Sequence, residues 1–147
     1  AEDCFIIHLT KVMVPAFGDD AGWDEPLGLP VEIVPLAKPF ALYAGNMFQG
    51  RVLENGKPVP GAEVEVEFYP GPGLKGEAPH SLLTTQTIKA DDAGIFTYAM
   101  PKSGWWGFAA LREGPQKIAR NGVDKPVEIG GVIWVHAEEF PVLKPLE

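Results

Sequence analysis

Apolar and charged residues alternate most regularly over residues 62–68, where the sequence is Ala-Glu-Val-Glu-Val-Glu-Phe. A period of two predicts a β-strand with one face in a core and the other in solvent. The face predicted to be buried consists of Ala62, Val64, Val66 and Phe68. The other face carries glutamates, and we expect this charged row to be solvated and to discourage aggregation between sheets.

Other apolar or β-branched segments, separated by Gly, Pro, Asn and Asp, are also typical of short strands. The further predicted strands are 4–14, 31–36, 47–53, 82–89, 95–100, 105–111 and 127–136. Asn55-Gly56 and residues 91–94 predict tight hairpin turns. Pro35 and Pro39 favour an edge position for the strand that they bracket. Gly130-Gly131 predicts a bulge or a close approach of two backbones.

The strand spacing, with no segment of helical periodicity, predicts an all-β fold. We expect an antiparallel Ig-like or transthyretin-like β-sandwich of about seven strands with an N-terminal strand arm. Residues 1–28 are interpreted as the N-terminal strand followed by an acidic linker, together a remnant of a preceding domain. Residues 29–140 are interpreted as the sandwich. Residues 141–147 are interpreted as a tail, and the polar residues 112–125 as a connection with an Asn-Gly turn.

Composition narrows the classes of partner. The chain has 147 residues and a formal net charge of −8, which disfavours nucleic-acid binding because phosphates need a basic surface. No apolar run approaches the ~18 residues of a membrane span. The one cysteine, Cys4, excludes an internal disulfide. In a strand, Cys4 and His8 share a face but lie roughly 13 Å apart, too far for a catalytic dyad.

The candidate metal ligands are His136, His80 and His8, with Glu138 beside His136 in sequence. Imidazole and carboxylate groups suit nickel, cobalt or zinc, although the three histidines form no recognised ligand motif. Exposed or strand-end histidines without metal are the alternative. The carboxylates of residues 19–25 are a weaker candidate for a hard cation such as calcium.

Two adjacent tryptophans, Trp105 and Trp106, follow Gly104. Alternation predicts that one ring lies in the core and that the other faces a ligand, a neighbouring domain or another chain.

Two segments carry a family resemblance. Residues 48–64 contain Asn-Gly-Lys-Pro-Val-Pro-Gly-Ala, and residues 85–96 are Thr-Gln-Thr-Ile-Lys-Ala-Asp-Asp-Ala-Gly-Ile-Phe. This pattern resembles the carboxypeptidase-regulatory and transthyretin-like sandwich modules. Residues 29–36, 101–110 and 132–136 add a closer resemblance. Over residues 22–137 the chain is similar to the C-terminal half of a bacterial exported family, described as a periplasmic component associated with cobalt/nickel uptake transporters.

The resemblance implies a periplasmic, non-enzymatic accessory domain that handles nickel or cobalt, with metal-transporter subunits as partners. The alternative is an envelope structural or protein-interaction module without metal, which contacts a partner chain or a second copy. A hydrolase of the transthyretin-like class is disfavoured, because that chemistry needs clustered His and Arg, and arginine occurs only at 51, 112 and 120.

Overall fold

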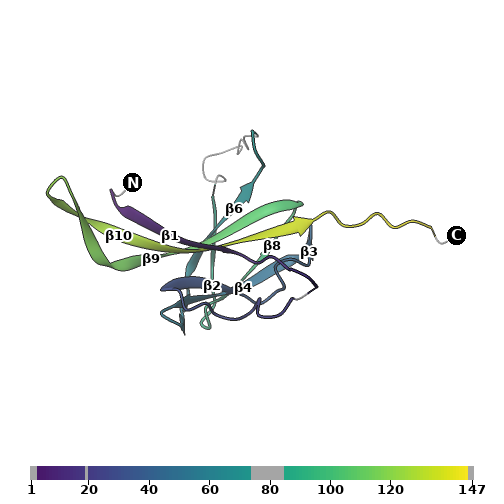
Figure 1. The fold of residues 1–147 in the computed structure, drawn as a ribbon, viewed down its shortest axis with the longest axis horizontal. Coiled ribbons are helices and arrows are strands. Elements are labelled where there is room, and N and C mark those ends of the chain that lie inside the picture. Colours follow the sequence, from purple (N-terminus) through teal and green to yellow (C-terminus); the bar gives the residue numbers. More distant parts are fainter. Residues whose placement is uncertain (1–2, 19, 74–84, 146–147) are drawn as a thin grey trace.

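The computed structural model describes residues 3–18, 20–73 and 85–145, which form ten strands and no helix. The strands lie in two sheets that pack face to face around apolar side chains (Figure 1). This architecture confirms the predicted all-β sandwich. The strand count exceeds the predicted one of about seven, because some strands are too short to show alternation.

The smaller sheet is antiparallel. It consists of β2 (Val31–Pro35), β4 (Met47–Glu54), β5 (Lys57–Pro58) and β8 (Ile95–Ala99). β4 is central, and β2 forms an edge, as the prolines around it predicted. Asn55 and Gly56 have φ values of 50° and 75°, which confirms the predicted hairpin turn between β4 and β5. Residues 91–94 do form a tight turn, in which Gly94 N–H donates to the carbonyl oxygen of Asp91. The hairpin predicted at this turn was wrong, because the turn connects β7 (Gln86–Lys89) of the larger sheet to β8 of the smaller sheet.

The larger sheet has six strands. In order along the sheet they are β1 (Phe5–Val12), β10 (Val123–Glu138), β9 (Gly104–Arg120), β6 (Glu63–Tyr69) and β7 (Gln86–Lys89), and β3 (Leu42–Tyr43) also pairs with β10. β1 and β3 run parallel to β10, so the sheet is mixed and the purely antiparallel prediction was wrong. Alternation is identical in parallel and antiparallel strands, and no hairpin joins β1 to β10, so the sequence carried no signal for this direction.

Residues 112–125 differ most from the prediction. They continue β9 and β10 as a long hairpin instead of forming a polar connection (Figure 1). The predicted turn is present, since Asn121 and Gly122 have φ values of 53° and 75°. The turn joins paired strands directly, and ladder hydrogen bonds therefore order a segment that has little apolar pattern.

The core lies between the sheets. Phe48, Phe96 and Phe108 are almost completely buried, and the ring of Phe108 lies 4.7 Å from that of Phe48 and 5.6 Å from that of Phe96. Trp106 is buried, whereas Trp105 is 39% exposed. This confirms the prediction that one of the two adjacent rings lies in the core and the other faces outward. The predicted burial of Phe68 was wrong, because its ring lies at the margin of the sandwich with an exposed fraction of 37%.

At Gly131, the backbone of β10 in the larger sheet comes close to the backbone of β2 in the smaller sheet. A Cβ atom built there would lie 2.7 Å from the carbonyl carbon and oxygen of Val31 and 2.8 Å from the nitrogen of Glu32. The predicted close approach is therefore present. The irregularity in the β9–β10 ladder lies instead between Pro126 and Glu128.

One buried ion pair links the sheets. Lys11 of β1 and Glu32 of β2 are both buried, and Nζ of Lys11 lies 3.1 Å from Oε2 of Glu32. The Glu32 carboxylate also accepts hydrogen bonds from the backbone N–H groups of Leu27 and Gly28, at 3.0 and 3.1 Å. The pair therefore attaches the edge strand β1 and the segment before β2 to one carboxylate.

Candidate functional site

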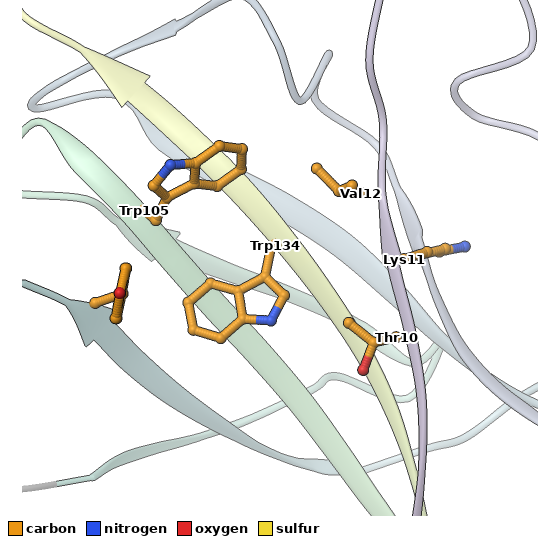
Figure 2. Close-up of a pocket in the computed structure, with 6 residues that line it drawn as sticks. Thr10, Lys11, Val12, Trp105 and Trp134 are labelled. Carbon is orange, nitrogen blue, oxygen red and sulfur yellow. The ribbon is translucent and has the colours of Figure 1, made fainter. Parts of the chain in front are cut away.

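Three aromatic side chains gather on the outer face of the larger sheet. Tyr69, Trp105 and Trp134 come from β6, β9 and β10, and with residues 10–12 of β1 they line a cavity of about 440 Å³. Figure 2 shows the indole rings of Trp105 and Trp134 beside each other on neighbouring strands, with β1 along one side. Tyr69 is 44% exposed, and so, together with Trp105, it offers aromatic surface to solvent.

The indole ring of Trp134 forms the floor of this cavity, and a glycine in β9 makes room for it. A Cβ atom at Gly107 would lie 2.9 Å from Cη2 and Cζ2 of Trp134, so the indole ring lies directly over the β9 backbone. The ring of Tyr69 meets that of Trp134 edge to face, with centroids 6.5 Å apart and planes at 80°. These contacts fix the ring of Trp134 in place as a platform.

Two further hollows share Trp134 with the first. One, of about 270 Å³, is lined by His8, Glu65 and Glu67 and has Gly107 and Ala109 beneath it. The other is about 480 Å³, and its lining includes Met13, Phe40, Trp105, His136 and Glu138. Because Trp134 borders all three hollows, we treat them as one aromatic groove, defined by Tyr69, Trp105, Trp134 and the residues just named.

The charge of the aromatic groove is negative. Glu65, Glu67 and Glu138 line it, whereas the Lys11 side chain points away from the two indole rings (Figure 2). The ammonium group of Lys11 is neutralised by Glu32. A positively charged ligand is therefore favoured at the rim of the groove.

The predicted metal ligands lie in different parts of the groove or outside the described residues. His136 Nδ1 is 3.0 Å from Oε1 of Glu138, and the His136 ring packs against Trp105 at a centroid distance of 5.0 Å. The His8 ring lies over Gly130. A Cβ atom built on Gly130 would come within 2.8 Å of Cδ2 of His8. His80 falls outside the described residues. The structure thus brings together His136 and Glu138.

Within residues 3–18, 20–73 and 85–145, no group of three or more His, Cys, Asp or Glu side chains is arranged to hold a metal ion. The Cys4 thiol lies 3.7 Å from Oε2 of Glu128. In the acidic segment 19–25, Lys38 donates a hydrogen bond to Asp20, and this bond holds the pKa of the Asp20 carboxyl below its ordinary value. That carboxylate is engaged by a lysine of the same chain.

Sequence reasoning predicted that one ring of the Trp105–Trp106 pair faces outward without specifying which, and it missed Tyr69, Trp134 and the role of Gly107. The alternation that assigned Glu65 and Glu67 to an outer face also applies to Tyr69, two residues further on. The register of β6 against β9 pairs Tyr69 with Trp105 and Glu67 with Gly107, and no sequence pattern carries that information.

A comparison with protein-family models matches residues 1–114 to DUF4198, a domain of unknown function. No curated protein and no solved structure matches the chain. The part of the chain described by the structure contains no helix long and apolar enough to cross a membrane. The family match begins at residue 1 and so includes β1, which lines the aromatic groove. On this match, the chain belongs to the DUF4198 family.

Proposed function

We propose that the chain is a non-enzymatic protein-interaction module of the bacterial envelope, whose aromatic groove holds an extended, basic and apolar segment of a partner protein. The observation that carries this proposal is the meeting of Tyr69, Trp105 and Trp134 in one open cavity. Large exposed aromatic surface on a folded domain is typical of interaction sites. Tryptophan and tyrosine are also the side chains that contribute most binding energy at interfaces.

The chemistry of the rim selects the class of segment. Carboxylates at Glu65, Glu67 and Glu138 favour lysine or arginine in the ligand, and exposed indole rings add cation–π attraction. Apolar and proline side chains suit the aromatic floor, because proline-rich segments bind aromatic-lined grooves in an extended form.

Peptide binding tests this function. We expect a ten-residue peptide of proline, leucine and lysine to quench tryptophan fluorescence and to give saturable binding by calorimetry. Trp105→Ala should weaken this binding at least tenfold, because about 1.4 kcal/mol corresponds to a factor of ten and a buried interface tryptophan contributes more. Met47→Ala is the matched control, since Met47 is 63% exposed on the smaller sheet.

The lysine-to-glutamate version of the peptide should bind much more weakly, because it meets the acidic rim. Equal binding of the two peptides, or no binding of either, would contradict the proposed function. Equal affinity of the wild type and Trp105→Ala would place the peptide outside the aromatic groove and would contradict it as well.

A second candidate function is the handling of nickel or cobalt by a periplasmic accessory domain that contacts transporter subunits. The hydrogen-bonded pair of His136 and Glu138 favours it, because a carboxylate that holds one ring nitrogen orients the other nitrogen toward a metal. The resemblance to exported proteins associated with cobalt/nickel uptake supports the same function and location.

Titration of the chain with Ni²⁺ and Co²⁺ tests this candidate. We expect one ion per chain, with loss of binding in His136→Ala and an affinity lower by about 10–100-fold in Glu138→Gln. His8→Gln should bind as the wild type does. Unchanged binding in His136→Ala would exclude the pair as the site.

A further inference from the structure

We infer that residues 140–145 of one copy of the chain occupy the aromatic groove of a second copy, so that two copies exchange these segments reciprocally. The inference rests on the proposed function, because it names a partner for that groove. It follows from the chemistry of a segment that the sandwich leaves uncovered.

This segment follows β10, and no strand within the described residues pairs with it. Val142 is 90% exposed and Leu143 is 84% exposed, although both are apolar. Figure 1 shows the segment extending away from the sheets beyond the end of β10. Two apolar side chains in this position gain free energy when another surface covers them.

The sequence of the segment matches the aromatic groove. Pro141 and Pro145 favour an extended polyproline conformation and remove backbone donors, so the segment fits an aromatic groove better than an open sheet edge. Lys144 adds one positive charge, which complements the carboxylates of Glu65, Glu67 and Glu138. The segment therefore has the apolar, proline-containing and basic character that the groove favours.

The geometry favours exchange over folding back. β10 contributes Trp134 to the groove, and the segment continues from the end of β10 away from the sheets (Figure 1). The ring of Phe140 packs on Tyr43 with centroids 5.3 Å apart, which fixes the start of the segment. A return to its own groove would require a reversal of direction at Phe140, and Phe140 favours extended backbone because it precedes Pro141.

A second copy needs no such reversal. Six residues in extended conformation reach about 20 Å, enough to cross the outer face of a neighbouring sheet. When a two-fold axis relates the copies, each gives a segment and accepts one, and the assembly closes as a dimer.

Sedimentation velocity of the full chain over a range of concentrations tests the inference. We expect a monomer–dimer equilibrium whose dissociation constant rises at least tenfold in Val142→Asp/Leu143→Asp and in Trp105→Ala. Met47→Asp, on the smaller sheet, should leave the equilibrium unchanged. An equimolar mixture of the segment variant and the groove variant should dimerise more strongly than either variant alone but less strongly than the wild type, because a mixed pair retains one of the two exchange contacts.

A wild-type chain that is monomeric at all concentrations would overturn the inference. So would a dimer that persists unchanged in Val142→Asp/Leu143→Asp. If self-association is absent while the lysine-containing peptide still binds through Trp105, the proposed function stands and the exchange does not. If the peptide also fails to bind, both the proposed function and the segment exchange are contradicted.

Discussion

Replacement of Lys11 by methionine is expected to lower the free energy of unfolding by about 3–5 kcal/mol. Methionine retains most of the apolar volume of lysine but removes the ammonium group. Glu32 is only 1% exposed, and among the described residues its carboxylate would keep the N–H groups of Leu27 and Gly28 as partners. An uncompensated buried charge is costly because protein atoms solvate it less well than water does.

Urea denaturation followed by tryptophan fluorescence measures this loss. The matched control is Lys89→Met, which removes an ion pair with Glu63 whose side chains are 71% and 65% exposed. The control should change stability by less than about 0.5 kcal/mol. A loss below about 1 kcal/mol in Lys11→Met would show that the buried charge is satisfied in another way.

The double variant Lys11→Met/Glu32→Gln separates the charge from the hydrogen bonds. A neutral glutamine leaves no buried charge, and its carbonyl oxygen can still accept one of the two backbone N–H groups. We therefore expect the double variant to be more stable than Lys11→Met alone. A double variant less stable than Lys11→Met would contradict this account of the pair.

Gly131→Ala is expected to destabilise the chain by about 1–3 kcal/mol. The added methyl group would lie 2.7–2.8 Å from backbone atoms of Val31 and Glu32. Unlike side-chain atoms, backbone atoms of a paired strand cannot relieve such a clash by a rotamer change. The sheets must separate locally, and the movement also affects the carboxylate that anchors Lys11. For that reason we expect Gly131→Ala and Lys11→Met to be non-additive.

The neighbouring glycine provides the control. A Cβ atom at Gly130 would meet Cδ2 of His8 at 2.8 Å and Cδ2 of Leu111 at 3.0 Å, both of which belong to side chains that can rotate. Alanine also suits a strand better than glycine does. Gly130→Ala should therefore lie near the wild type by urea denaturation, and equal losses for the two variants would contradict the role assigned to the Val31 backbone.

The proposed binding function uses the outer face of the larger sheet. The sandwich core uses the inward residues of β9 and β10, and this leaves their outward residues free to serve binding. Trp105 and Trp106 illustrate the division, since adjacent positions on β9 place one ring in the groove and the other in the core.

The sequence alone determined the secondary-structure class, most strand positions and the two Asn-Gly hairpin turns. Alternation at residues 62–68 and the Asn-Gly pairs act locally, through side-chain direction and backbone φ preference, so they are visible without the fold. The direction of Trp105 relative to Trp106 follows from the same local rule. The match to DUF4198 is likewise a property of the sequence.

Only the tertiary structure decided which strands are neighbours, and the candidate site depends on that choice. Tyr69 meets Trp134 because β6, β9 and β10 are adjacent, and Lys11 meets Glu32 because β1 joins the larger sheet opposite β2. The same strand alternation is compatible with many pairings and with both directions. The packing of complete side chains between two sheets selects one of them, and that selection joins residues that lie far apart along the chain.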